Sequence, residues 1–506
     1  MSLPTLARPA RLAATLSLPA AVLASSVLCA QSTPEARSGV AGAQLSSSAT
    51  RADFDVLRRA LEEAHGGFDR FSTRAELDRR FNKHRARLNR PMSTLAFAGI
   101  VAEAIAEIRD GHARLELDSL TAAALAGARV LPLRVQLEGE RVMVLFNDSP
   151  TDSTIKPGME ILRINGRTAG DVVGTLLPKV SGDGFIETGR RARLARDFAP
   201  LFWLYVDQAD AYTITARDTA GRRITTTLPG VLERDRQATV NPVNAVIAEN
   251  LARLDAPPGN ITLQFFDNTA IARLRIRSFG GQTFPATLDS AFRALREKGA
   301  GALILDLRGN GGGVDEYGAL LVSYFAEQPF RYFDHIRVTT IAPSFATWLP
   351  RTFDAVRAGT VPARGGGFRV TPAYHPGVGE QQPAAHPFLG KVVVLIDGGS
   401  FSTTADVAAH LRSRGRATFV GEETAGTYEG NTSGLNALIV LPNSRLRLKV
   451  MMYGYWNAVK KPDKPGRGTL PDYVVTRRVA DVLRGIDPAL RRATALLGKN
   501  KTTQAD

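Results

Sequence analysis

The stretch from Lys391 to Gly434 constrains the fold most, because it reads as strand, turn, helix and strand in close succession. Residues 391–396 contain the continuous apolar run Val392–Ile396, which is typical of a strand covered on both faces. A Gly-Gly turn follows, then a predicted helix over 403–414 and a second strand over 417–420. This order predicts an α/β fold, in which ligands bind beyond the carboxyl ends of the strands.

The turn itself, Asp397-Gly398-Gly399-Ser400-Phe401-Ser402, supports two interpretations. A serine exposed between a strand and a helix, beside free backbone N–H groups, is suited to act as a nucleophile. Ser402 or Thr403 could equally serve only as a helix N-cap, with Asp406 completing a pattern similar to a capping box. The turn alone does not decide between them.

The first 30 residues have the pattern of a signal peptide: Arg8 and Arg11 precede an apolar stretch that Pro19 interrupts. Cleavage before Gln31 would remove Cys29, the only cysteine, so the mature chain would have neither disulfides nor a cysteine nucleophile. We therefore expect an exported bacterial protein, periplasmic or extracellular, without a stable membrane span once the signal is removed.

Charge and histidine spacing exclude several classes of site. The net charge is +15, but the basic residues are scattered, without the clustering of a nucleic-acid site, so no nucleic-acid partner is expected. The histidines outside position 112 lack the spacing of a metal site, and we expect no metal. The glycine run 309–313 lacks the Lys-Ser/Thr of a P-loop, so it suits an oxyanion better than a nucleotide.

The 506 residues are too many for one hydrophobic core, and composition divides them into segments. Residues 31–50 read as a disordered linker, 51–120 as a helical region, 130–242 as a mostly β module and 255–480 as an α/β core, with a C-terminal helix and tail over 481–506. Residues 329–387 read as a long loop-rich insertion.

These motifs together resemble family S41 of the serine peptidases, which comprises the tail-specific or C-terminal processing proteases and their tricorn-like relatives. The resemblance is carried, in chain order, by Asp110-Gly111-His112, by Asp306 to Gly313, by the Ser-Phe-Ser turn, by Gly421 to Gly426 and by Gly466 to Asp472. It implies a crotonase-like α/β peptidase core with polypeptide substrates and no cofactor. It also implies that 130–242 is a PDZ-like module, with Pro157-Gly158 to Asn165-Gly166 as the matching turn-strand-turn.

The resemblance assigns roles to individual residues. It places the nucleophile at Ser402 rather than Ser400, and the oxyanion hole at the backbone N–H groups of Gly311, Gly312 and Thr403. The tail-specific branch has a lysine base after its Gly-Glu-x-Thr-x-Gly motif, but here that position is Thr427.

The base must then come from elsewhere, and His112 matches the histidine base of the tricorn-like branch. A carboxylate fixes the imidazole tautomer in such sites, and Glu429 is the first candidate for it, with Asp463 second. A non-catalytic ligand- or peptide-binding protein on the same fold is the alternative function, because fold does not determine function.

Overall fold

The computed structural model describes residues 43–237, 241–255, 257–267, 270–345 and 353–498. From residue 43 onward they belong to one compact unit. The predicted signal peptide, and most of the predicted linker, lie outside the described residues. Within the described residues, no helix is both long enough and apolar enough to cross a membrane.

The N-terminal part of the described chain is helical, as predicted. Its elements are β1 (Gln44–Leu45), α2 (Ser47–Ala64), α3 (Arg74–Ala86), β2 (Met92–Ser93) and α4 (Thr94–Ala106). Helix α2 buries Phe54, Leu57 and Leu61 at helical spacing, and Thr73 begins α3 with a capping box to Glu76. Because α2 begins at Ser47, the end of the predicted linker is ordered.

The β module contains more helix than its sequence predicted. Its sheet has the order β10-β9-β7-β6-β5. The strands are β4 (Arg129–Val130), β5 (Leu133–Glu138), β6 (Arg141–Asn147), β7 (Glu160–Ile164), β8 (Arg167–Thr168), β9 (Ala211–Arg217), β10 (Arg223–Pro229) and β11 (Val231–Leu232). Strands β5 and β6 form one antiparallel hairpin, and β9 and β10 form another.

Between β8 and β9 the chain forms helices, where a mostly β segment was expected. These are α6 (Ala169–Leu176), the 3₁₀ turn η1 (Leu177–Lys179), α7 (Glu187–Arg196) and α8 (Phe198–Tyr205). Val172 and Leu176, like Phe198 and Phe202, recur at helical spacing and are buried against the sheet. Four-residue spacing gives one apolar face to a helix, so the mostly β interpretation of this part is wrong.

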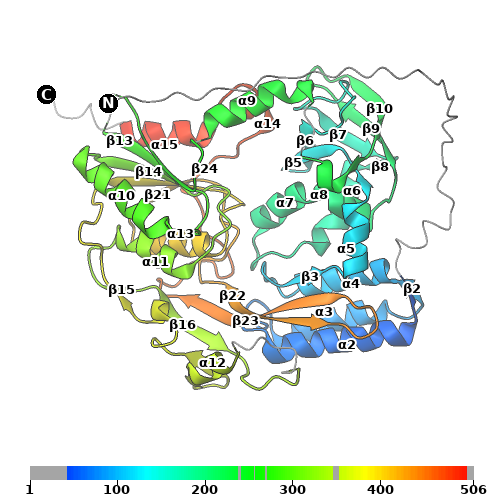
Figure 1. Cartoon of the computed structure of the whole chain (residues 1–506), viewed down its shortest axis with the longest axis horizontal. Helices are drawn as coiled ribbons and strands as arrows, with labels where there is room; N and C mark the ends of the chain where they lie inside the picture. The colour runs from blue at the N-terminus through cyan, green and yellow to red at the C-terminus, as the bar shows by residue number, and fades with distance from the viewer. Residues whose placement is uncertain (1–42, 238–240, 256, 268–269, 346–352, 499–506) are drawn as a thin grey trace, which may run out of the picture. The chain divides into compact units, whose positions relative to one another are not determined.

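The core sheet has the order β12-β13-β14-β20-β21-β24, parallel from β13 onward. Its strands are β12 (Ile261–Phe265), β13 (Ile271–Ile276), β14 (Ala302–Asp306), β20 (Lys391–Ile396), β21 (Thr418–Gly421) and β24 (Tyr473–Val474). Helices α10 (Phe284–Glu297), α11 (Asp315–Ser323) and α13 (Thr403–Ser413) cover one face, and α15 (Pro488–Gly498) covers the other (Figure 1).

The two covered faces explain the continuous apolar run in β20. Val394 and Ile396 pack on the α10–α11–α13 side, whereas Val393 and Leu395 pack on the side of α15. A strand between two helical layers needs apolar residues at every position, as the sequence predicted.

The insertion at 329–387, predicted to be rich in loops, contributes strands to a third sheet. That sheet has the order β17-β18-β16-β23-β22, with β3 (Arg114–Glu116) also paired to β23. Its other strands are β16 (Phe333–Val338), β17 (Thr360–Pro362), β18 (Phe368–Val370), β22 (Thr432–Val440) and β23 (Arg447–Asn457). Around it lie β15 (Phe330–Arg331), β19 (Glu380–Gln381) and α12 (Phe353–Ala358). The remaining α-helices of the described chain are α5 (Ser119–Ala126), α9 (Ala245–Leu254) and α14 (Val479–Leu483).

A buried ionic cluster closes the carboxyl end of β14. Asp306 is fully buried and accepts bonds from Arg273 and Arg308, both at 2.7 Å, while Arg308 also binds Asp487 of the C-terminal segment. Although burial alone would raise the pKa of Asp306, the surrounding guanidinium groups hold that pKa well below its usual range. The cluster therefore fixes the start of the glycine run that follows β14.

Candidate active site

Ser402 lies at a strained turn, with φ 57° and ψ −132°, where α13 begins. A non-glycine residue with such backbone angles costs of order 1–3 kcal/mol and is found mainly where function requires it. Its side chain makes no capping bond to the helix. Instead, Ser402 Oγ lies 3.2 Å from His112 Nε2, although the two residues are 290 positions apart. The N-cap interpretation of this side chain is therefore wrong.

The neighbouring Ser400 has a structural role. It is fully buried, and its Oγ donates to Leu307 O at 3.0 Å and accepts from the Asp397 N–H at 3.1 Å. These bonds tie the serine turn to the end of β14. Ser402, whose Oγ faces an imidazole, is the serine with the geometry of a nucleophile.

His112 is held by its backbone and by its ring. Its N–H donates to Asp110 Oδ1 at 2.7 Å, and its ring stacks on Phe401 with centroids 4.4 Å apart. Gly111 is required beside it, because a Cβ there would lie 2.8 Å from the Phe401 ring. Immediately afterwards, β3 pairs with β23 through Leu115 and Leu448, which anchors the histidine loop to the third sheet.

Asp110 is buried, and both of its carboxylate oxygens have hydrogen-bond partners. Its Oδ2 lies 2.6 Å from Nε2 of buried His65, and Gly67 N–H donates to Nδ1 of the same ring. Because Nδ1 accepts, His65 is the neutral tautomer that donates from Nε2. Burial works to raise the pKa of Asp110, but the bonds with His112 and His65 hold that pKa well below its usual range.

Asp183, which the sequence analysis did not select, also faces His112. It lies between η1 and α7, is 2% exposed, and accepts the Gly111 N–H at Oδ1 at 2.6 Å. Burial raises the pKa of Asp183 to about 6, with His112 opposing this shift and Asp110 adding to it. The one local signal was an aspartate between two glycines, Gly182-Asp183-Gly184, and many surface turns share that pattern.

One ring nitrogen of His112 and one oxygen each of Asp110 and Asp183 lie within 4.8 Å of one another. This is the only such group of potential metal ligands among the residues the structure describes. Since Asp110 already binds His65 and the His112 backbone, the geometry suits proton handling by His112 better than a cation.

The three predicted oxyanion donors differ in their hydrogen bonding. Gly312 N–H donates to Asn310 Oδ1 at 2.9 Å. For Gly311 and Thr403, no bond from the N–H is found within the described part of the chain. A Cβ on Gly312 would lie 2.7 Å from Ser402 Cβ and 3.0 Å from Thr403 N, so the glycine turn and the nucleophile turn are in direct contact. Gly311 and Thr403 are therefore the available donors.

Glu429 and Asp463, the two carboxylates that the sequence suggested as partners of His112, have other surroundings. Glu429 Oε2 accepts the Gly466 N–H at 2.6 Å, and Asp463 is exposed. No hydrogen bond or ion pair joins either carboxylate to His112 in the described ranges. Thr427, at the position of the missing lysine, is buried and donates to Gly430 O.

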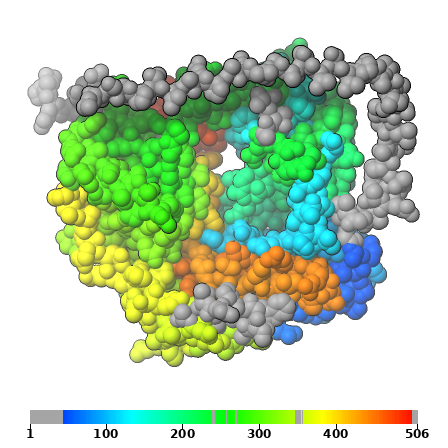
Figure 2. All heavy atoms as spheres, in the orientation of Figure 1, coloured from blue at the N-terminus to red at the C-terminus, as the bar shows by residue number. Residues whose placement is uncertain are grey.

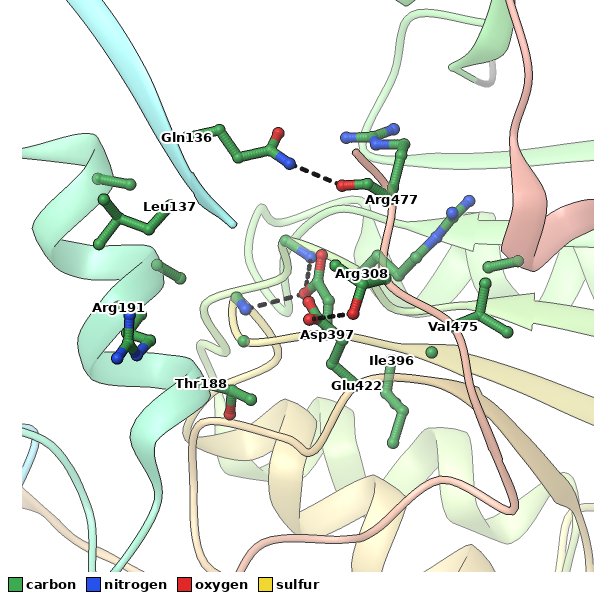
Figure 3. Close-up of a pocket in the computed structure, with 18 of the residues that line it drawn as sticks. Gln136, Leu137, Thr188, Arg191, Arg308, Ile396, Asp397, Glu422, Val475 and Arg477 are labelled. Atoms are coloured by element: carbon green, nitrogen blue, oxygen red, sulfur yellow. Dashed lines mark hydrogen bonds between the residues drawn. The ribbon is translucent and has the colours of Figure 1, made fainter. Parts of the chain in front are cut away.

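A cavity of about 460 Å³ adjoins the other side of the serine turn. In Figure 3, Asp397 and Glu422 lie at its centre, Thr188 and Arg191 enter from α7, and Arg477 enters from the segment between β24 and α14. Asp397 Oδ1 accepts the N–H groups of Gly309 and Gly399. The cavity is therefore in contact with both the glycine turn and the serine turn, and Figure 2 shows the surface hollowed between the β module and the core helices.

Asp406, one turn after Ser402 on α13, is a buried acid beneath the site. Its oxygens accept from Asn457 Nδ2 at 2.9 Å and Asn431 Nδ2 at 3.0 Å. Burial raises the pKa of Asp406 to about 8 against these bonds, with Asp315 adding to the shift. At neutral pH this carboxyl is therefore mostly protonated.

The raised pKa of Asp406 predicts a pH dependence of stability. Between about pH 4 and 8 the folded state keeps a proton that the unfolded state has released, so the free energy of unfolding falls as pH rises through this window. We expect Asp406→Asn to remove this fall, an effect on the order of a few kcal/mol in denaturant titrations from pH 5 to 9. The exposed Asp289→Asn is the control, and parallel curves for wild type and Asp406→Asn would contradict the assignment.

Comparison with known proteins agrees with this geometry. The model of peptidase family S41 matches residues 270–475. None of the curated proteins matches the sequence. Mature CPAF has a similar structure, with 15% identity and a TM-score of 0.62, over 89% of this chain and 96% of that one. CPAF complexed with lactacystin gives 14% identity, a TM-score of 0.62, and 89% and 98% coverage. At these identities the likeness shows the shared fold.

Proposed function

We propose that this chain is a peptidase of family S41, whose model matches residues 270–475, and that it cleaves polypeptides through an acyl-enzyme, with Ser402 as the nucleophile and His112 as its base. The observation that carries the proposal is the 3.2 Å contact between Ser402 Oγ and His112 Nε2 at a strained strand-to-helix turn. A nucleophile beside a base that a third group can orient is the general arrangement of such enzymes.

The chemistry follows from the two atoms in contact. His112 Nε2 takes the hydroxyl proton as Ser402 Oγ bonds to the scissile carbonyl carbon, and the carbonyl oxygen becomes an oxyanion. His112 then gives the proton to the leaving amine as the C–N bond breaks. A water molecule, deprotonated by the same nitrogen, releases the acyl group and regenerates Ser402.

The oxyanion would be stabilised by the N–H groups of Gly311 and Thr403. Thr403 is the first residue of α13, and Gly311 lies four residues before α11 begins. Both positions face the positive ends of helix dipoles, which favour negative charge. Gly312 would join them if its N–H turned away from Asn310, and it then completes the set expected from the sequence.

Substitution of the two serines tests the nucleophile. Ser402→Ala is expected to abolish peptide hydrolysis and to leave the melting temperature nearly unchanged, since its hydroxyl makes no structural bond. His112→Ala is expected to lower kcat/KM by several orders of magnitude. Ser400→Ala removes bonds within the turn, so its main effect is on stability.

A fluorophosphonate probe separates the enzyme from the alternative, a binding protein on the same fold, because only an activated serine reacts with it. Labelling of wild type and Ser400→Ala, and none of Ser402→Ala, is the expected pattern. Equal labelling of Ser402→Ala, or hydrolysis retained by it, would reject the proposal.

We also propose that the β module receives an extended segment of the substrate. Strand β5 is at the edge of its sheet, and α7 runs beside it. Gln136 and Leu137 of β5 and Thr188 and Arg191 of α7 together line the cavity in Figure 3. A peptide added to a free strand edge gains main-chain hydrogen bonds, which is how PDZ-like modules bind.

Peptides with free and amidated C-termini test whether this module recognises a carboxylate. If it does, amidation should cost roughly 1–3 kcal/mol in kcat/KM, because the bonds to the carboxylate are lost. Arg477→Gln, at the cavity, should reduce the difference between the two peptides. Equal cleavage of both by the wild type would reject tail recognition and leave Ser402 and His112 unaffected.

Export is the remaining part of the proposal, and the pattern of the first 30 residues supports it. A bacterial periplasmic or extracellular location follows from it. N-terminal sequencing of the protein recovered from the envelope fraction is expected to begin at Gln31. A mature protein that starts at its initiator methionine would contradict export by this signal.

A further inference from the structure

Two buried polar atoms of neighbouring side chains in the site have no hydrogen-bond partner among the described residues. They are Nδ1 of His112 and Oδ2 of Asp183. Unpaired polar atoms in such a position are costly, and each calls for a physical account. Their two side chains belong to the group whose ligating atoms lie within 4.8 Å of one another.

We propose that Asp183 is the positioning residue of this peptidase: its Oδ2 accepts the Nδ1–H of His112 and stabilises the imidazolium that forms during acyl transfer. The inference rests on the proposed function. It assigns to Asp183 the role that the sequence led us to expect of Glu429.

The tautomer of His112 requires such an acceptor. To take the Ser402 proton, Nε2 must be unprotonated, and the neutral ring then carries its hydrogen on Nδ1. Asp110 Oδ1 lies nearer, 3.7 Å from Nδ1, but both Asp110 oxygens are already used: Oδ2 by His65 and Oδ1 by the His112 N–H. Asp183 Oδ2 is the carboxylate oxygen that remains free.

The loop that carries Asp183 is bound to the loop that carries His112. Gly111 N–H donates to Asp183 Oδ1, and Gly184 N–H donates to Arg109 O at 2.9 Å. Arg193 of α7 donates to Gly111 O and Ser181 O, both at 2.9 Å. The carboxylate and the imidazole are therefore held in one rigid assembly, as positioning requires.

The charged groups that face Asp183 set its response to pH. His112 and Asp110 face it from the histidine loop, Arg193 from α7, and Arg70 from the segment after α2. Burial raises the pKa of Asp183 to about 6, so its charge is present at neutral pH and is lost in mildly acidic solution. While charged, Asp183 favours the protonated imidazole, and its removal must therefore weaken proton binding by His112.

The test compares Asp183→Asn with the matched control Glu429→Gln, each a neutral replacement of nearly equal volume. Asp183→Asn is expected to lower kcat by roughly 10²–10⁴-fold with little change in KM, as loss of the carboxylate does in a Ser-His-Asp site. The acidic limb of its kcat/KM profile should move down by roughly one pH unit, since an opposite charge within a few ångströms has been removed.

Glu429→Gln is expected to leave the acidic limb in place and to change kcat less than tenfold, because its carboxylate binds Gly466 N–H. Asp183→Glu should recover part of the rate and return the limb toward its wild-type position. A purely structural Asp183 would lower the rate without moving the limb.

An unmoved acidic limb in Asp183→Asn, or a rate within tenfold of wild type, would overturn the proposal. A limb that moves in Glu429→Gln instead would assign the role to Glu429. Thermal melting of each variant shows whether it is folded. If Asp183→Asn does not fold, the neutral Asp183→Ser takes its place, and the acidic limb of its kcat/KM profile should move down in the same way. Failure of the proposed function is distinguishable, because it appears as hydrolysis retained by Ser402→Ala.

Discussion

The pairing of β3 with β23 is the interaction on which the active site depends. Three residues of β3 follow directly after the histidine loop, and their register on β23 sets where His112 can lie. The end of α2 docks on the same strand, where Gly66 N–H donates to Met451 O. A Cβ at Gly66 would lie 2.4 Å from Gly454 N, so only glycine permits this approach. One strand thus positions both His65 and His112 against a serine far away in sequence.

Rigid surroundings hold Ser402 in its strained backbone conformation. The Asp306 cluster fixes the end of β14, Ser400 joins that end to the serine turn, and Asp397 binds the N–H groups of Gly309 and Gly399. Together these bonds hold the glycine turn against the nucleophile turn. A strained residue persists only where its neighbours over-determine the conformation, and here that support comes from buried polar groups rather than from apolar packing alone.

Local sequence patterns predicted the parts of this structure that local physics determines. The apolar run of β20 and the turns after β14 and β20 were expected on these grounds, whereas the approach of His112 to Ser402 was expected only from the resemblance to family S41. The helices at 169–205 were not expected, although their apolar residues recur at helical spacing. The strands within 329–387 were not expected either, since their apolar faces are completed by distant partners. Asp183 was missed for the same reason: an aspartate between glycines becomes distinctive only when folding places it beside Gly111 and His112.

Asp110 and Asp183 show how different surroundings shift the pKa values of two identical side chains in opposite directions. Both are buried beside His112, yet the pKa of Asp110 is lowered and that of Asp183 is raised. Asp110 is saturated by His65 and the His112 N–H, so its charge stabilises the fold at any pH above the ordinary carboxyl range and is lost only in stronger acid. Asp183 keeps an unpaired oxygen, and its charge lowers stability above about pH 6. A carboxylate kept partly unsatisfied in the native state retains its capacity to bind a new positive charge, which in the proposed mechanism is the imidazolium of His112.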